Sequence, residues 1–321
     1  MERVIDQLYS ILEERGFKGR VVSIQHLHDL RNEIERRHNQ GFFDKEFYQE
    51  ALSFFSFHPP DNLPLAASMI VVSVPRPQTK VSFTWNGNTL ALTIPPTYMK
   101  FREIQRQIEI LLTKWLAQKG CHTSLAKIPN KLLAVRSGLA EYGRNNITYI
   151  PGMGSFYQLI AFYSDLPCQE DDWREPRMMD RCKDCRICVT KCPTGAIMTE
   201  RFLLSTERCL VFHNERPPDH PFPDWIDPVS HNCLIGCMLC QQACPENKDF
   251  MEWFGGNETF SHEETSLFLN GASADRLPAT TQAKLKRLGM PELLEILPRN
   301  LGIFFRESGK AIKQHTITKE Y

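Results

Sequence analysis

The hydrophobic positions of the first 175 residues follow a helical period in some segments and a strand period in others. Apolar residues recur at helical spacing over residues 4–12 and stop before Gly16, which predicts a first helix. The β-branched stretches RVVSIQ at 20–25 and SMIVVSV at 68–74 predict two short strands. The longest helical pattern covers residues 101–120 and carries one continuous apolar stripe, which is expected to face a core.

Turn residues punctuate the rest of this region. The stretch WNGNTLALTI at 85–94 contains the Asn-Gly pair of a tight hairpin. Two further strand candidates, NITYI and SFYQLIAFY, flank a Pro-Gly-Met-Gly turn at 151–154. These patterns predict a mixed α/β domain of the α+β kind over residues 1–175.

The character of the chain changes twice after that domain. Residues 176–250 are dense in cysteine and proline and have only short apolar runs, as in a module held together by metal. Residues 251–321 predict a helical C-terminal segment, in which SHEE at 261–264 fits a capping box. Its predicted helix boundaries are starts at Pro278 and Pro291 and ends at Gly271 and Gly289.

Composition narrows the class of protein. The 321 residues are 42% hydrophobic and carry no net charge, so they can bury a large core and give no general electrostatic reason to bind nucleic acid. The N-terminal helix pattern is charged throughout, and no stretch approaches the roughly 18 apolar residues of a membrane span. We therefore expect a cytoplasmic protein without a membrane partner. Eleven cysteines in a reducing compartment favour metal or redox chemistry over disulfides.

The cysteine spacing carries the strongest chemical signal. The first run has the spacing C-x2-C-x2-C-x3-C followed by proline, which bacterial ferredoxins use for [4Fe-4S] clusters. A second run about fifty residues later repeats the C-x2-C-x3-C-P half of this pattern. Zinc is the alternative, but it takes four ligands in a tetrahedron and does not need this run twice. The cysteines are Cys182, Cys185, Cys188 and Cys192 in the first run, and Cys237, Cys240 and Cys244 in the second.

Two such runs predict two [4Fe-4S] clusters that exchange one ligand each, because the fourth cysteine of a run ligates the other cluster. The first cluster is expected to take three ligands from the first run and Cys244 from the second. The second cluster is expected to take Cys192, Cys237, Cys240 and one more cysteine. Cys209 and Cys233 compete for that place. Cys233 is spaced x3 from the run where x2 is usual, so we favour Cys209.

The order of these motifs resembles the epoxyqueuosine reductases and, more distantly, the reductive dehalogenases. The similarity is carried by SGLAEYGRNNITYIPGMGSF, CKDCRICVTKCPTGAI, ERCLVF and GCMLCQQACPEN. The resemblance implies a nitroreductase-like N-terminal domain that holds cobalamin, and two clusters that pass single electrons to cobalt. It also implies the reductive removal of an oxygen or a halide. Members of the family have a cysteine in the segment matching ERCLVF, which supports Cys209.

The sequence departs from the family at three points. The arginine- and aromatic-rich loop that the family sets near the corrinoid is not recognisable in residues 81–101. Epoxyqueuosine reductases place a proton-donating aspartate about where Ser124 stands, and no acidic residue occurs between Glu109 and Glu141. A serine is too weak an acid to replace it. The C-terminal extension that grips transfer RNA is also short, so tRNA is a less favoured partner. Residues 284–321 carry a mild excess of Lys and Arg, which a solvated helical tail explains equally well.

The stretch AEYGRNN at 140–146 offers a replacement for the missing acid. Tyr142 is expected to donate a proton with its pKa drawn down by Arg144, with Glu141 beside them. The alternative is an ion pair between Glu141 and Arg144 around a simple turn at Gly143. The candidates for contacts to a bulky cofactor are Gly143, Asn145, Gly152 and Gly154.

Three functions are consistent with these patterns. The first is a reductase that passes electrons to a corrinoid or another cofactor and then to a small-molecule substrate. The second is an electron-transfer or corrinoid-activating protein, whose partner would be a corrinoid protein. The third is epoxyqueuosine reduction on tRNA. All three need a low-potential electron donor of the ferredoxin or flavodoxin type.

Overall fold

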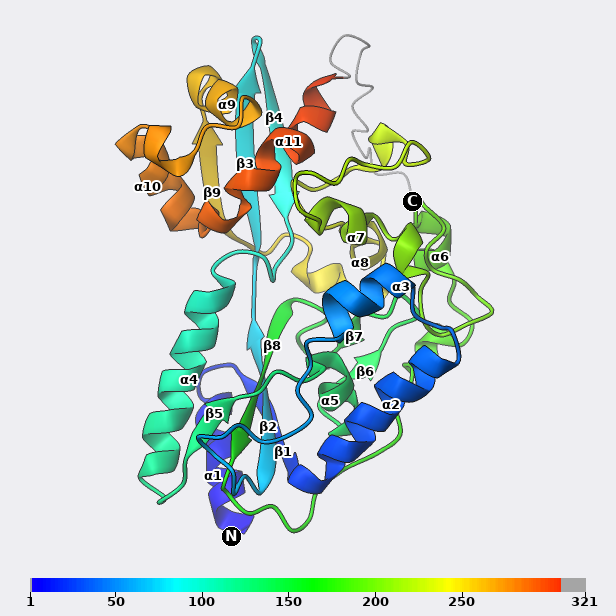
Figure 1. Ribbon diagram of the computed structural model, residues 1–321, viewed down its shortest axis with the longest axis vertical. Coiled ribbons are helices and arrows are strands. Elements are labelled where there is room, and N and C mark those ends of the chain that lie inside the picture. Colours follow the sequence, from blue (N-terminus) through cyan, green and yellow to red (C-terminus); the bar gives the residue numbers. More distant parts are fainter. Residues whose placement is uncertain (1, 307–321) are drawn as a thin grey trace.

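The computed structural model describes residues 2–306, and the lower lobe in Figure 1 is built on a four-stranded antiparallel sheet. The strand order is β1-β2-β8-β5, from Lys18–Ser23, Ser68–Pro75, Tyr157–Ser164 and Thr123–Leu125. β2, which contains SMIVVSV, is buried along nearly its whole length, as expected of a strand covered on both faces. The strands predicted at 20–25 and 68–74 are therefore confirmed, with β1 ending two residues early.

Helices cover both faces of this sheet because the side chains of β2 alternate between two cores. Ile70 and Val72 pack with α1 (Glu2–Glu13) and α4 (Phe101–Ala117) on one face. Met69 and Val71 pack with α2 (Leu27–Asn39) and α5 (Asn130–Arg136) on the other. The helix predicted over 101–120 is confirmed as α4, and its apolar stripe is buried.

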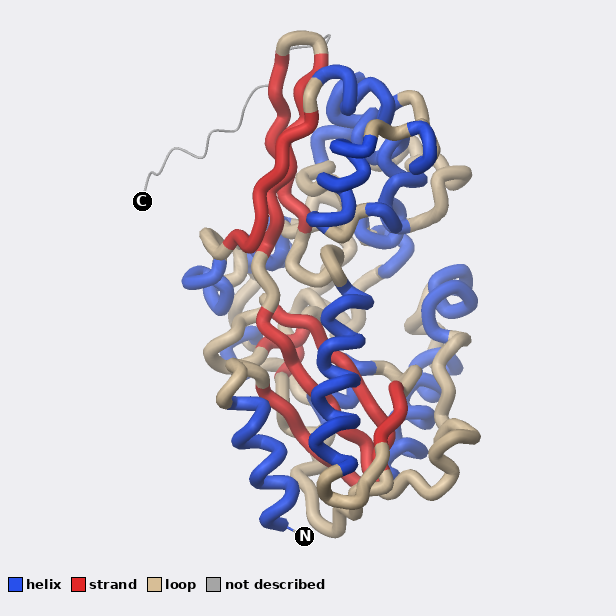
Figure 2. The backbone as a smooth tube through the Cα atoms, turned by 90° about the vertical axis from the view of Figure 1, so that its left-hand side faces the viewer, coloured by secondary structure: helices blue, strands red, loops and turns tan. Residues whose placement is uncertain are grey.

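The upper lobe has a three-stranded sheet of order β4-β3-β9. β3 (Gln78–Trp85) continues from β2 after two residues, and a tight turn with positive φ at Asn86 and Gly87 leads into β4 (Asn88–Ile94). β9 (Phe254–Phe260) pairs with β3 in parallel. Figure 2 shows the helices of this lobe gathered on one face of the sheet. These helices are α9 (His262–Leu269), α10 (Ala279–Leu288) and α11 (Leu297–Arg306).

The C-terminal segment, predicted to be helical from residue 251, contains one strand, so that prediction is wrong for β9. The strand sequence FGGNETF has two glycines and no β-branched run, and it becomes a strand only because β3 offers it a free edge. The sheet also joins residues 78–94, predicted within the first domain, to the C-terminal segment. The capping box at Ser261 and the left-handed helix end at Gly289 are confirmed. Residues 307–321 of the predicted tail lie outside the described residues.

The cysteine-rich residues lie between the two lobes as short helices and turns (Figure 1). The helices of this cysteine-rich module are α6 (Ile187–Lys191), α7 (Leu210–Glu215) and α8 (Leu239–Gln242). Its 3-10 turns are Asp180–Cys182, Thr206–Arg208, Pro228–Ser230 and Pro245–Phe250. The small strands β6 (Glu141–Tyr142) and β7 (Thr148–Tyr149) form a hairpin beside it. The remaining elements are α3 (Lys45–Phe47), a π-helix at Tyr48–Leu52, and 3-10 turns at Ile24–His26, Ala274–Arg276 and Pro291–Ile296. Among residues 2–306, no helix is long and apolar enough to cross a membrane.

Candidate iron–sulfur site and the adjoining cleft

Four cysteines line one cavity at the base of the cysteine-rich module, although one of them is far from the others in sequence. They are Cys182, Cys185, Cys188 and Cys244. The first three lie on the turn and helix of the first run, and Cys244 follows α8. Burial raises the pKa of the Cys188 thiol to about 11, and the other three thiols of the group add to the shift. Such thiols ionise most readily when a metal binds and displaces their protons.

A second group of four cysteines includes Cys240 of α8. Burial raises the pKa of Cys240 well above its ordinary value, and three nearby thiols raise it further. Burial also raises the pKa of the Cys209 thiol to about 11. The members of this group are Cys192, Cys209, Cys237 and Cys240.

Cys233, the competitor of Cys209, lies in a different setting. Its side chain is 1% exposed and packs with Phe156 and Met238. Its Sγ donates a hydrogen bond to the side-chain oxygen of Asn232 at 3.2 Å. Cys121 is half-buried, and Cys168 is buried in the core of the lower lobe. In the part of the chain that the structure describes, no three His, Cys, Asp or Glu side chains are placed to hold a single metal ion.

The β6–β7 hairpin supports the first group of cysteines. Arg144 is 8% exposed, and its guanidinium donates hydrogen bonds to the carbonyl oxygens of Cys182 at 2.7 Å and Cys185 at 3.2 Å. The Asn145 amide donates to the Tyr149 hydroxyl at 2.9 Å and to the Cys240 carbonyl at 3.4 Å. Gly143 must be a glycine, since a Cβ there would lie 2.5 Å from the ring of Tyr149.

These contacts contradict the reason for expecting an acid at Tyr142. Burial raises the pKa of Tyr142, and Arg144, which was expected to lower it, directs its charge at the cysteine loop. The Tyr142 ring instead packs edge-on against Phe202 at 5.0 Å. The alternative pair of Glu141 with Arg144 is also wrong, because Glu141 forms an ion pair with Arg177 at 2.5 Å.

The two glycines of the Pro-Gly-Met-Gly turn have different surroundings. Gly152 has a φ of 78° and almost no neighbours, as in an ordinary turn. Gly154 has a φ of 54°, and a Cβ there would lie 2.4 Å from Oδ1 of Asn247. That oxygen accepts a hydrogen bond from the Ser155 amide at 2.8 Å. The space beside the Gly154 backbone, where a cofactor was expected, is therefore filled by the side chain of Asn247, which follows the second cysteine run.

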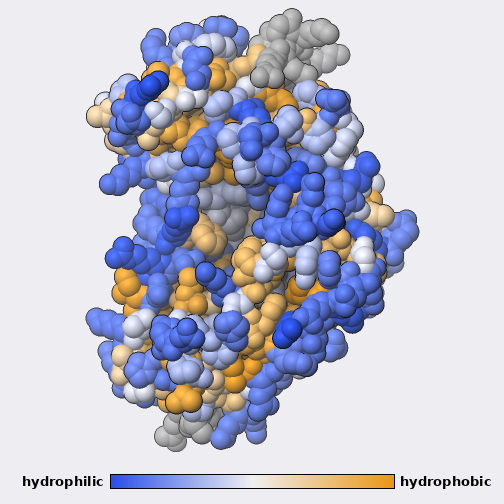
Figure 3. Space-filling view, in the orientation of Figure 1, coloured by the Kyte–Doolittle hydropathy of each residue, from blue (hydrophilic) through white to orange (hydrophobic). Residues whose placement is uncertain are grey.

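Sequence reasoning missed a polar group beside the second set of cysteines. The hydroxyl of Tyr98 donates a hydrogen bond to the carboxyl of Glu215, and the ammonium of Lys131 is close enough for the charges to interact. Glu215 and Lys131 keep solvent-accessible surface, yet the protein around them raises the pKa of Glu215 and lowers the pKa of Lys131. We call this group the cleft residues. Figure 3 shows a hollow between the two lobes on the face toward the viewer.

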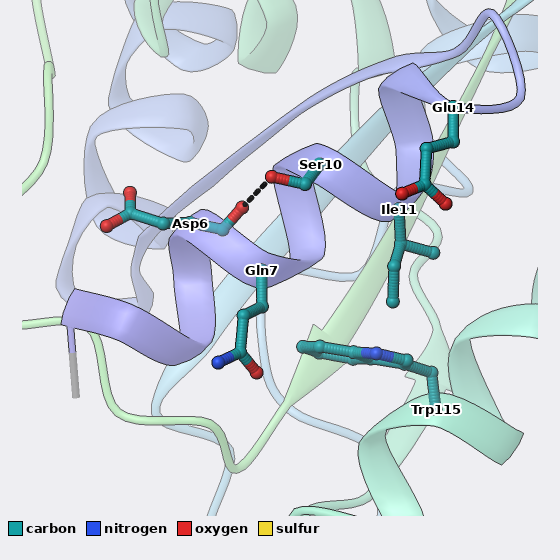
Figure 4. A pocket seen from close by; sticks show the side chains of 6 residues that line it. All are labelled: Asp6, Gln7, Ser10, Ile11, Glu14 and Trp115. Atoms are coloured by element: carbon teal, nitrogen blue, oxygen red, sulfur yellow. Dashed lines mark hydrogen bonds between the residues drawn. The ribbon is translucent and has the colours of Figure 1, made fainter.

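Two other places carry less chemistry. Ser124, where the family has an acid, directs its hydroxyl to Asn62 at 3.4 Å. A wide, open pocket lies between α1 and α4, where Trp115 lies beneath Ile11 and Gln7 (Figure 4). The carboxylate of Asp6 points away from that indole, so the polar groups of the pocket do not converge.

The comparison with protein families defines the class of the site. Residues 181–247 match the 4Fe-4S double cluster binding domain, so the chain contains a double-cluster iron–sulfur module. Among curated proteins, it is 25% identical to the epoxyqueuosine reductase of Staphylococcus aureus over 76% of this chain and 64% of that protein. It is 30% identical to the epoxyqueuosine reductase of Atelocyanobacterium thalassa over 44% of this chain and 46% of that protein. The chain thus matches less than two thirds of the length of these relatives.

Solved structures share the fold. Epoxyqueuosine reductase from Streptococcus thermophilus superposes with a TM-score of 0.66 at 17% identity, covering 92% of this chain and 79% of that one. The Bacillus subtilis enzyme, with its catalytic loop swung out of the active site, superposes with a TM-score of 0.63 at 19% identity, covering 94% of this chain and 80% of that one. A reductive dehalogenase is a more distant match, with a TM-score of 0.38. The mixed α/β architecture around a double-cluster module is therefore shared with epoxyqueuosine reductases.

Proposed function

We propose that this chain is an iron–sulfur reductase related to the epoxyqueuosine reductases, in which two [4Fe-4S] clusters pass electrons to an acceptor in the cleft. The observation that carries the proposal is the arrangement of eight cysteines in two groups of four, each with one member taken from the other run. Ligand exchange of this kind is typical of two-cluster ferredoxins. The proposed ligands are Cys182, Cys185, Cys188 and Cys244 for the first cluster, and Cys192, Cys209, Cys237 and Cys240 for the second.

The two clusters have different neighbours, which gives the electron path a direction. The cavity of the first cluster is lined by Ile187, whose side chain is 40% exposed. Residues 177–191 around it carry five Arg or Lys and two Asp, and the pairing of Arg177 with Glu141 and of Arg181 with Glu246 leaves a small positive excess. A positive surface favours an acidic partner, as a low-potential donor of the ferredoxin or flavodoxin type would be. The second cluster faces the cleft residues, so electrons enter at the first cluster and leave at the second.

The family resemblance is the ground for two further proposals. One is that the protein binds cobalamin, and the other is that the lower lobe has a nitroreductase-like fold. The predicted cradle does not fit a corrinoid. Gly143 lies against Tyr149, and Gly154 lies against Asn247, so side chains of the protein itself occupy both approaches. The proposal of a corrinoid therefore rests on the family resemblance alone. The reducing cytoplasm, where cysteines stay available for iron, is the proposed compartment.

Epoxyqueuosine reduction on tRNA is the second candidate, favoured by the names of the relatives. A solved epoxyqueuosine reductase that shares this fold contains an epoxyqueuosine-modified tRNA stem loop. The absence of an acid at Ser124 is the feature that separates this chain from those enzymes. Incubation of the reduced protein with that stem loop, followed by mass analysis of the nucleoside, tests the candidate directly. Loss of one oxygen atom supports it, and an unchanged nucleoside argues for another acceptor.

The first experiment is anaerobic purification with added cobalamin, followed by iron, sulfide and cobalt analysis. Two clusters require about eight irons per chain, and stoichiometric cobalt supports the corrinoid reductase. About eight irons without cobalt supports an electron-transfer or activating protein. About one or two metal ions per chain, with zinc in place of iron, would overturn the iron–sulfur proposal.

A further inference from the structure

Glu215 and Tyr98 are fixed to the backbone of the second cysteine run. Asn214, the residue before Glu215, donates from its side-chain amide to the carbonyl of Gly236 at 2.6 Å. Its side-chain oxygen accepts from the Gly236 amide at 3.0 Å. These two bonds hold the end of α7 against the residue that precedes Cys237. Glu215 therefore has a fixed position relative to the second group of cysteines.

The ring of Tyr98 lies on the same glycine. Gly236 has a φ of 73°, and a Cβ there would come within 2.7 Å of the Tyr98 hydroxyl oxygen. Tyr98 reaches this place from the loop before α4, and its hydroxyl donates to the carboxyl of Glu215. One glycine thus seats the tyrosine that holds the carboxyl, and the next residue along the chain is Cys237.

Charged groups from other elements face this pair. Lys131 of α5 interacts electrostatically with Glu215 and with the Cys209 and Cys240 thiols. On the helix of Glu215, the His213 ring contacts the Glu207 carbonyl at 2.8 Å, and the following Arg216 pairs with Glu46 and Glu50. The charge of Arg216 is therefore engaged elsewhere, whereas that of Lys131 acts on Glu215.

We propose that Glu215 takes up a proton when the second cluster is reduced and returns it to the acceptor in the cleft. The proposal rests on the proposed function, because it requires the second cluster. An electron that reaches the cluster adds negative charge near Tyr98 and Lys131, which both interact with the carboxylate, and this favours its protonation. One electron comes from the low-potential donor, and one proton comes from water. Two such rounds supply the two electrons and two protons that remove an oxygen atom as water.

The other acids considered for this task are engaged elsewhere. Glu141 is paired with Arg177, Tyr142 is buried against Phe202, and Ser124 is not acidic. Glu215 alone among these candidates is linked to the second group of cysteines, through Tyr98 and Lys131, and keeps access to solvent. The surrounding protein partly desolvates its carboxyl and raises its pKa, which brings protonation closer to neutral pH than for an ordinary glutamate.

The test is a redox titration of the purified holoprotein, with mediators and dithionite, followed by electron paramagnetic resonance at several pH values. The signal that disappears in Cys209→Ala identifies the second cluster. We expect its midpoint potential to fall as pH rises across the titration of Glu215, and to be independent of pH in Glu215→Gln. Glu200→Gln, an exposed acid on the same module, serves as the control and should keep the wild-type slope.

Two further variants distinguish proton uptake from a purely structural role. Lys131 and the Tyr98 hydroxyl both lower the pKa of Glu215, so Lys131→Met and Tyr98→Phe should move the pH-dependent range upward. If Glu215→Gln loses its cluster, the shift of the pH-dependent range in these two variants tests proton uptake by Glu215 in its place. A wild-type potential that does not change with pH overturns the proposal while leaving the reductase intact. Absence of the second signal in the wild type overturns the proposed function and this proposal with it.

Discussion

Cys209 and Cys233 are both near the second run of cysteines, but they have different neighbours. The thiols of Cys192 and Cys237 both affect the pKa of Cys209, whereas Cys237 is the cysteine that affects Cys233. Cys233 is almost fully buried among apolar side chains and behaves as a small hydrophobic residue. This difference in surroundings separates a proposed ligand from a core residue.

We therefore expect Cys209→Ala to lose the iron of one cluster, about half of the total, because three ligands hold a cluster poorly. Cys233→Ala, the matched control, should keep all of its iron and lose only about 1 kcal/mol of stability. Iron and sulfide analysis after anaerobic purification measures both variants. Loss of a cluster in Cys233→Ala alone would reverse the assignment.

At the same scale, the spacing of the cysteines predicts which ones group together, but it does not predict the cleft residues. The eight cysteines lie in short motifs whose spacing has a direct chemical meaning. Tyr98, Lys131 and Glu215 come from three separate segments with no shared motif, and only the packing of the lobes brings them together. The pKa expected for Tyr142 was wrong because a sequence shows that an arginine is nearby but not where its charge points.

The β6–β7 hairpin is the element that joins the lower lobe to the first cysteine run. Its Arg144 donates to carbonyls on both sides of the Cys182–Cys185 loop from a buried position. Buried carbonyl groups that lose their donor cost about 1–3 kcal/mol each. The hairpin therefore shapes the loop that would wrap the first cluster.

We expect Arg144→Met to weaken the first cluster. The loop then loses several hydrogen bonds at once, so iron should be released faster to a chelator, and the iron content should fall toward half. Arg181→Met is the matched control, because Arg181 lines the same cavity but pairs with Glu246 at the surface. Equal rates of iron release from the two variants would contradict a special role for Arg144.

The Pro-Gly-Met-Gly turn docks the lower lobe on the second cysteine run. Gly154→Ala places a Cβ against Asn247 in addition to straining a left-handed backbone, whereas Gly152→Ala adds only the strain. We expect about 1 kcal/mol of destabilisation for Gly152→Ala and about 2–4 kcal/mol for Gly154→Ala. Urea unfolding of the two variants measures the difference. Equal effects would show that the contact with Asn247 contributes little.

The predictability of these elements depends on whether their signals are local. β2 and α4 were predicted because each carries its own period and is buried accordingly. β9 was missed because its two glycines give no strand signal, and its pairing with β3 bridges more than 170 residues of sequence. The Asn86–Gly87 turn was predicted correctly. Its hairpin was assigned to the wrong lobe, because its pairing with β9 depends on the whole fold.

At the scale of the whole molecule, the cysteine-rich module separates a surface for electron entry from the cleft. If an acidic donor docks over the first cluster, long-range attraction controls the rate at which it arrives. Salt screens such attraction, with a Debye length of about 8 Å at physiological ionic strength. The rate of reduction by a ferredoxin or flavodoxin should therefore fall as salt is added.

Charge reversal on that surface provides the sharper test. Lys183→Glu combined with Lys191→Glu should slow reduction by the protein donor at low salt by roughly tenfold or more, since each change places repulsion where attraction stood. Reduction by dithionite, a small chemical reductant, should change far less, which separates docking from damage to the cluster. Lys286→Glu on α10, exposed in the upper lobe, is the matched control. If all variants accept electrons from the protein donor at the same rate, electrons enter elsewhere, and the direction proposed for the path through the two clusters is wrong.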